Sequence, residues 1–178
     1  MNKANNTQGF DLNANSTAFK KGEVLQRAGE FSNCVFYVKK GLLKSYVVDE
    51  KGKEHIFIFA SEGWIIADIE SQEFNKPSEL YIDCIEDSEV IVFDYKFFQT
   101  ENLKDDQIRK NINLLARRLA MLQRRVIMLM SASAAERYDK FLETYPELPN
   151  RVPQHMIASY LGITPQALSN IRKFRLSK

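Results

Sequence analysis

Short stretches of alternating polar and apolar residues, separated by glycine-containing turns, dominate residues 17–98. In residues 54–60, for example, the alternation puts Phe57 and Phe59 on one face of the expected strand and Ile56 on the other. About seven or eight such strands, short and regularly spaced, are typical of a sandwich or a barrel. This part of the chain is therefore expected to form an all-β domain.

The segment that follows repeats apolar residues at intervals of four and three, which is the seam of a coiled coil. The seam residues are Ile108, Ile112, Leu115, Leu119, Leu122, Val126 and Leu129. The seam predicts a long helix that pairs with the same helix of a second copy of the chain. A helix that packs only on its own domain is the alternative. Further apolar residues of this helix are expected to pack on the β domain, namely Leu114, Met121, Ile127, Met128 and Met130.

Residues 153–173 have the layout of two short helices joined by a tight turn. Gly162 suits the left-handed backbone that ends a helix, and Thr164 followed by a proline is a strong helix start. Upstream, Ser-Ala-Ala-Glu at 133–136 is a capping box, and its helix should stop at Pro146. The segment therefore predicts a helix-turn-helix, the motif that places a helix in the major groove of DNA.

The second helix of this motif would turn a polar face without carboxylates outward. Amide side chains bond adenine edges, and Arg or Lys bond guanine edges or phosphates. Base contacts are expected from Gln166, Ser169 and Asn170. Phosphate contacts are expected from Thr164, Arg172, Lys173 and Arg175. An ordinary helical hairpin with a solvated polar face is the alternative.

Charge is divided unevenly along the chain. Residues 1–100 have a net charge of −5 and residues 101–178 a net charge of +7, within a total of +2. From residue 149 onward the chain has basic residues and no carboxylate. A basic end module on an acidic domain favours double-stranded DNA as the partner of the end module alone.

These patterns divide the chain into a flexible lead-in (residues 1–16), a β domain (17–100), a dimerisation helix (101–131) and a helix-turn-helix domain (132–178). Neither a run of about 18 apolar residues nor a signal-peptide core occurs, so no membrane association and a cytoplasmic location are expected. Cys34 and Cys84 match no metal spacing and are expected to be buried thiols. No catalytic constellation is visible, so an enzyme is not expected.

Several segments together resemble the catabolite-activator family, the group of the cyclic-AMP receptor and the fumarate–nitrate regulator. They are residues 19–23, 36–44, 49–54, 131–138, 151–154 and 157–165. The helical segments are similar to the branch common in Bacteroidetes-type bacteria. The resemblance implies an α+β fold: an N-terminal double-stranded β-helix (a jelly-roll-like β-roll of the cyclic-nucleotide-binding type), a long dimerisation helix and a C-terminal helix-turn-helix domain. It also implies a homodimeric transcription regulator that reads an inverted-repeat operator and contacts RNA polymerase.

The chain departs from this family at the ligand site. Where cyclic-nucleotide binders carry a phosphate-binding arginine, this chain has Pro77, so cyclic AMP is not expected. Haem and an iron–sulfur cluster are not expected either, because no axial ligand stands out and the N-terminal cysteine cluster of the oxygen-sensing branch is missing. An unknown small-molecule effector stays open. The guessed lining of its pocket is Trp64, Asp68, Ser78 and Tyr81.

The DNA-reading helix departs from the family as well. Gln166 and Asn170 stand where well-known members use an arginine–glutamate pair and a further arginine, so the operator should differ. The module is expected to be wingless. A protein-interaction adaptor or sensor that has lost DNA binding is a second interpretation. A cupin-like module is a third, but it would need several histidines in the strands, and the chain has only His55 and His155.

Overall fold

The computed structural model describes residues 14–98 and 104–176, so nearly all of the expected lead-in lies outside the described residues. The strands are β1 (Thr17–Phe19), β2 (Val24–Gln26), β3 (Cys34–Lys40), β4 (Leu43–Val48), β5 (Glu54–Ala60), β6 (Ile65–Ile66), β7 (Tyr81–Cys84) and β8 (Ser88–Asp94). The helices are α1 (Ile69–Phe74), α2 (Asp105–Ser131), α3 (Ala134–Thr144), α4 (Gln154–Leu161) and α5 (Pro165–Leu176). Short 3-10 turns cover Tyr95–Phe98 and Leu148–Asn150.

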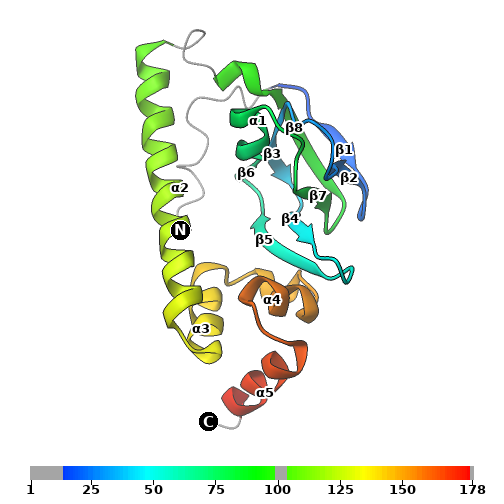
Figure 1. The fold of residues 1–178 in the computed structure, drawn as a ribbon, viewed down its shortest axis with the longest axis vertical. Helices are drawn as coiled ribbons and strands as arrows, with labels where there is room; N and C mark the ends of the chain where they lie inside the picture. Colours follow the sequence, from blue (N-terminus) through cyan, green and yellow to red (C-terminus); the bar gives the residue numbers. More distant parts are fainter. Residues whose placement is uncertain (1–13, 99–103, 177–178) are drawn as a thin grey trace.

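The strands form two four-stranded antiparallel sheets, ordered β1-β8-β3-β6 and β2-β7-β4-β5 (Figure 1). Val38 and Val90 from one sheet and Leu43 and Ile82 from the other are fully buried in one apolar cluster. Because apolar residues from both sheets meet in this cluster, the strands close into a sandwich with its own core. The predicted β-roll is confirmed.

Strand β5 departs from the predicted alternation. Its pairing with β4 shifts in register, since Ser45 lies opposite Ile58 and Tyr46 opposite Ile56, which leaves Phe57 unpaired. Such a bulge bends the strand and turns its side chains out of strict alternation. Phe59 is 1% exposed while Phe57 is 41% exposed. The prediction that these two side chains share a face is therefore wrong.

Helix α2 runs along one side of the roll, and α3, α4 and α5 gather at its lower end (Figure 1). Leu114 packs on a roll cluster that includes Tyr37 and Ile65. After α2, the predicted capping box opens α3: Ser133 N–H donates to Glu136 Oε2 at 2.7 Å, and Glu136 N–H donates to Ser133 Oγ at 3.3 Å. Each bond satisfies a backbone donor that a helix start leaves free.

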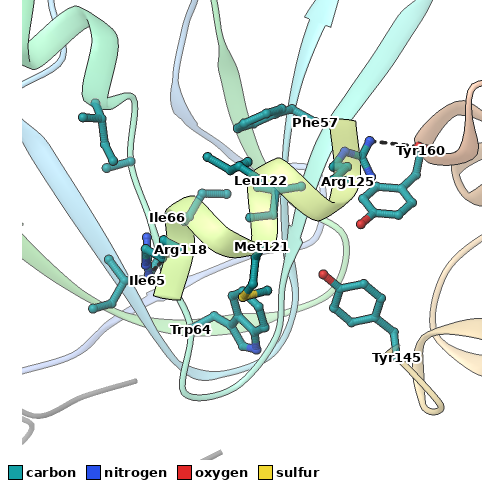
Figure 2. A pocket seen from close by; sticks show the side chains of 13 residues that line it. Phe57, Trp64, Ile65, Ile66, Arg118, Met121, Leu122, Arg125, Tyr145 and Tyr160 are labelled. Atoms are coloured by element: carbon teal, nitrogen blue, oxygen red, sulfur yellow. Dashed lines mark hydrogen bonds between the residues drawn. The ribbon is translucent and has the colours of Figure 1, made fainter. Parts of the chain in front are cut away.

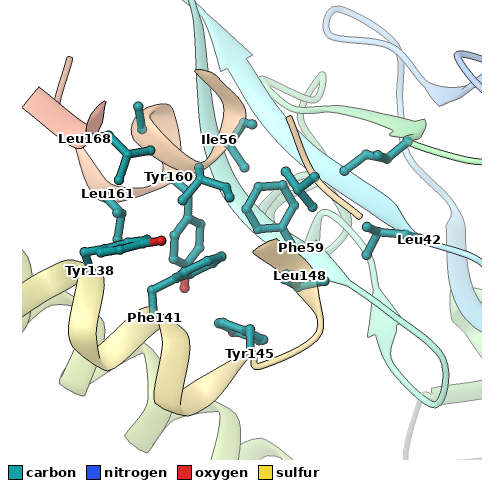
Figure 3. Close-up of a cluster of buried hydrophobic side chains, with 14 of the residues drawn as sticks. Leu42, Ile56, Phe59, Tyr138, Phe141, Tyr145, Leu148, Tyr160, Leu161 and Leu168 are labelled. Carbon is teal, nitrogen blue, oxygen red and sulfur yellow. The ribbon is translucent and has the colours of Figure 1, made fainter. Parts of the chain in front are cut away.

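The helical module, residues 132–176 with α3, α4 and α5, shares a core with the roll (Figure 3). Phe59 of the roll lies 5.2 Å from the ring of Tyr160 on α4, and Phe141 of α3 lies 5.6 Å from the same ring. The hydroxyl of Ser159 donates to Glu54 O at 2.7 Å and accepts from Ile56 N–H at 3.0 Å. The roll and the helix-turn-helix are therefore packed as one body.

An ion-pair cluster reinforces this contact. The guanidinium of Arg151 donates two hydrogen bonds to Glu62, at 2.9 and 3.0 Å, and also pairs with Glu86. Both carboxylates belong to the roll, and Arg151 belongs to the helical module. Two-pronged arginine–carboxylate geometry is stronger than a single contact, so this pair restricts motion between the two parts.

The two cysteines are free thiols. Burial is the main cause that raises the pKa of the Cys84 thiol to about 11 and raises that of Cys34 above its ordinary value. Thiols that stay protonated are poor nucleophiles and poor metal ligands. Within the described residues there is no group of His, Cys, Asp and Glu placed to hold a metal ion, and no helix is long and apolar enough to cross a membrane.

Candidate functional site

Helices α4 and α5 form the predicted helix-turn-helix. Gly162 ends α4 in the left-handed region, with φ 65° and ψ 36°, and its N–H donates to the carbonyls of Ala158 and Ser159. Two residues later, Thr164 Oγ1 accepts from Ala167 N–H at 3.1 Å and caps α5. Leu168 is fully buried and holds α5 against α3 and α4. The turn and the cap are the local features that the sequence predicts.

The predicted contact residues of α5 are on or near the surface. Gln166, Asn170, Lys173 and Arg175 are exposed, whereas Ser169 and Arg172 are half-buried. The Gln166 amide donates to Asn170 Oδ1 at 3.2 Å, so two amides one turn apart are held side by side. Helix α5 carries no carboxylate, and its outward surface has amide and cationic groups beside Phe174, which is 64% exposed.

Two of the predicted phosphate contacts have partners within the chain. The hydroxyl of Thr164 is used as the cap of α5. The guanidinium of Arg175 pairs with Asp139 of α3 and lies 5.7 Å from the centre of the Tyr138 ring. Any anion that binds Arg175 must therefore compete with Asp139.

The predicted seam of α2 lies on the surface of the single chain, and we call these seven residues the α2 stripe. Leu119, in the middle of the stripe, is 68% exposed, and Ile108 at one end is half-buried. The opposite side of the helix packs on the chain itself: Leu114 and Met121 lie beside the roll, as predicted, whereas Met128 lies beside α3 and α4 instead. Ile127 and Met130 are 54% and 82% exposed, so their predicted packing on the β domain is wrong. Their positions along the helix turn both side chains away from the side of α2 that the roll covers.

A cavity of about 120 Å³ lies where the roll, α2 and the helical module meet (Figure 2). We call it the junction cavity. Its walls are mainly aromatic and aliphatic, and Figure 2 shows that they come from segments far apart in the sequence. Its lining includes Phe57, Trp64, Arg118, Arg125, Tyr145 and Tyr160.

Comparison with known proteins agrees with this architecture. Residues 16–101 match the family model described as the cyclic nucleotide-binding domain. The chain is 23% identical over 164 residues to the anaerobic regulatory protein of Haemophilus influenzae, and 24% identical over 164 residues to the fumarate and nitrate reduction regulatory protein of Vibrio cholerae. These matches cover 85% of the chain but only 63% and 65% of the two relatives. The chain thus spans less than two thirds of the length of these relatives.

Solved structures show the same fold. The structure of FixK2 from Bradyrhizobium japonicum matches with a TM-score of 0.77 at 20% identity, covering 91% of this chain and 85% of that one. A transcriptional regulator of the CRP/FNR family from Thermus thermophilus matches with a TM-score of 0.70 at 17% identity, covering 88% of this chain and 82% of that one. The chain is therefore similar in sequence and fold to regulators of the Crp/Fnr family. Its suggested Bacteroidetes-type branch stays a prediction.

The guessed pocket residues do not share one cavity. Trp64 lines the junction cavity. Asp68 is buried: its Oδ1 accepts from Ser71 N–H at 3.1 Å and caps α1, and its Oδ2 accepts from the Ser78 hydroxyl at 2.6 Å. Tyr81 stacks on Tyr46 with ring centres 5.3 Å apart. The structure therefore joins Asp68 with Ser78 and leaves the other two elsewhere.

Two arginines of the junction cavity are not among the site residues that the sequence predicts. Arg118 Nη2 donates to the carbonyl of Ile65 at 2.9 Å, and Arg125 Nη2 donates to the carbonyl of Tyr160 at 2.9 Å. The Arg125 guanidinium also lies 3.7 Å from the centre of the Tyr160 ring. Desolvation by burial lowers the pKa of Arg118 to about 10. Their seven-residue spacing puts both on the same side of α2, and the roll covers that side.

Proposed function

We propose that the chain is a homodimeric, sequence-specific DNA-binding regulator of transcription. The observation that carries this proposal is the outward face of α5, which presents amides and cations without a carboxylate at the end of the molecule away from the roll (Figure 1). Such a face suits the base edges and phosphates of the DNA major groove. The regulators to which the chain is similar support the same function.

The roles within α5 follow from exposure and bonding. Gln166 and Asn170, held together at 3.2 Å, are the proposed readers of an adenine edge, and Ser169 supports them. Lys173 and Arg172 are the proposed phosphate contacts. Thr164 acts first as the helix cap, and Arg175 contributes only when it leaves Asp139. The amides therefore supply specificity, and the cations supply affinity that depends on salt.

The α2 stripe supports the dimer. Six of its side chains are exposed, and together they make a continuous apolar surface on one side of a helix of 27 residues. Exposed apolar surface of this kind marks an interface, and the four–three spacing suits the same helix of a second copy. A two-fold axis along this stripe would place two α5 helices about 34–36 Å apart, one turn of DNA.

We further propose that the effector is not cyclic AMP. The carboxylate of Asp68 already caps α1, and a phosphate next to it would meet like charge. Pro77 supplies no cation, and Lys76 is engaged with Glu70 at 2.6 Å. Neither haem nor an iron–sulfur cluster is part of the proposal. The junction cavity is the proposed effector site instead.

Selection of random duplex DNA by the purified full-length protein tests the proposal. We expect recovery of an inverted repeat with half-sites about one helical turn apart. The Gln166→Ala/Asn170→Ala variant should lose preference for the recovered sequence, with a fall of about tenfold to 100-fold per half-site. His155→Gln, which alters an exposed side chain of α4, is the matched control. Binding that never exceeds salt-sensitive nonspecific affinity would favour the adaptor interpretation.

A further inference from the structure

The junction cavity contains positive charge without a matching negative charge. Arg118 Nε and Arg125 Nη1 are buried and have no hydrogen-bond partner among the described residues. No ion pair within the described part of the chain includes either arginine; their bonded partners are backbone carbonyls. Buried polar groups are nearly always bonded, and a buried charge is costly unless it is paired. The two guanidiniums therefore have unused capacity to bind an anion.

The surroundings of Arg118 strengthen this point. A second cavity of about 150 Å³ shares Ile65, Ala67, Ile69 and Arg118 with the junction cavity, so this side chain separates two spaces beside α2. The low pKa of about 10 that burial gives Arg118 still leaves it charged at neutral pH. A ligand with one negative group would therefore contact the desolvated guanidinium of Arg118 from either of the two cavities. Pairing there would be stronger than on the surface.

The rest of the cavity wall favours a ligand with an apolar part. Phe57, Trp64, Ile66, Met121 and Leu122 line the cavity together with the two arginines, and Figure 2 shows these side chains around the same space. A cavity of about 150 Å³ accepts a molecule the size of benzene. The junction cavity, at about 120 Å³, is close to that size. Its walls and volume fit one small ring or a short alkyl chain.

We propose that the junction cavity binds a small amphipathic carboxylate, with its carboxylate group on Arg118 and its apolar part against Trp64. This inference rests on the effector site proposed above and names the chemical class of its ligand. A planar carboxylate matches the two-pronged donor geometry of a guanidinium. Because Tyr145 and Tyr160 belong to the helical module, the bound molecule contacts the DNA-binding part of the chain directly.

Trp64 is the single tryptophan of the chain, so its fluorescence reports an occupant of this cavity without a label. The full-length protein is titrated without DNA with phenylacetate, octanoate, the neutral phenylacetamide and cyclic AMP. We expect a saturable change with at least one of the two carboxylates and none with phenylacetamide or cyclic AMP at equal concentration. Arg118→Gln should abolish the response. Arg118→Lys should weaken it by about tenfold, because an ammonium group cannot donate two parallel hydrogen bonds to one carboxylate. Arg117→Gln, at an exposed neighbour on the same helix, should leave it unchanged.

Several outcomes would overturn the proposal. They are equal responses to phenylacetate and phenylacetamide, equal affinities of the Arg118→Gln and Arg117→Gln variants, or no response to either carboxylate up to about 10 mM, beyond the millimolar range of weak fragments. If Arg118→Gln does not fold, judged by circular dichroism, the Arg118→Lys variant decides. Carboxylate binding by a protein that selects no DNA would refute the DNA-binding function and leave this proposal intact.

Discussion

Leu119→Asp should break the dimer while leaving the fold of each copy in place. Leu119 is 68% exposed in the single chain, in the middle of the α2 stripe. Full burial of a leucine side chain stabilises by about 1.5–3 kcal/mol, so burying the exposed two thirds contributes about 1–2 kcal/mol per copy. Two copies meet at a two-fold axis, which makes the loss about 2–4 kcal/mol. At about 1.4 kcal/mol per tenfold, the dimer dissociation constant should rise about 30- to 700-fold.

Two facing aspartates would add repulsion, so this range is a lower bound for the loss. Sedimentation equilibrium across protein concentrations measures the dissociation constant, and circular dichroism checks the fold. Leu114→Asp is the matched control on the same helix, because Leu114 packs on the roll cluster that contains Tyr37 and Ile65. That variant should instead lower the thermal midpoint of unfolding. A Leu119→Asp protein that dimerises as tightly as the wild type would refute the assignment of the α2 stripe as the dimer interface.

Three further predictions concern stability. Gly162→Ala should lower the free energy of unfolding by about 1 kcal/mol, since φ 65° disfavours a side chain; an unchanged urea midpoint would contradict this. Phe59→Ala should cost about 3–5 kcal/mol and release the helical module, seen as faster proteolysis near Tyr160. Burial acts to raise the pKa of Glu62, but hydrogen bonds from Arg151 hold that pKa below its ordinary 4.5. The stability from this lowered pKa is present above about pH 4.5 and is lost as pH falls further, so acid melts of Glu62→Gln should lack that part of the decline.

The roll and the helix-turn-helix could be predicted from the sequence because the patterns that indicate them are local. Strand alternation, the Ser133 capping box, the turn at Gly162 and the cap at Thr164 each depend on residues within one turn or strand, and the structure contains all of them. The alternation of β5 misled only at Phe57, where pairing with β4 introduces a bulge. That bulge depends on a neighbouring strand and leaves no mark in the sequence of β5 itself.

The pocket residues were harder to predict because the cavity is built from distant parts of the chain. Of the four guessed residues, Trp64 alone lines it, whereas Asp68 and Ser78 bond one another. Family position suggested them as ligand contacts, but a carboxylate beside a helix start satisfies that start itself. The inference from family position therefore identified a buried polar pair rather than a ligand contact.

Sequence by itself determined the order of elements, the turn and caps of the helix-turn-helix, and the apolar stripe of α2, because each is a pattern of neighbouring residues. Tertiary structure alone decided that Arg118 and Arg125 face the roll, and that Tyr145 and Tyr160 from the helical module complete the same cavity. Arginines on a long helix are usually solvated, and nothing local separates these two from Arg117 and Arg124. Their burial follows from the side of α2 that the roll covers, which is set by packing between segments more than fifty residues apart.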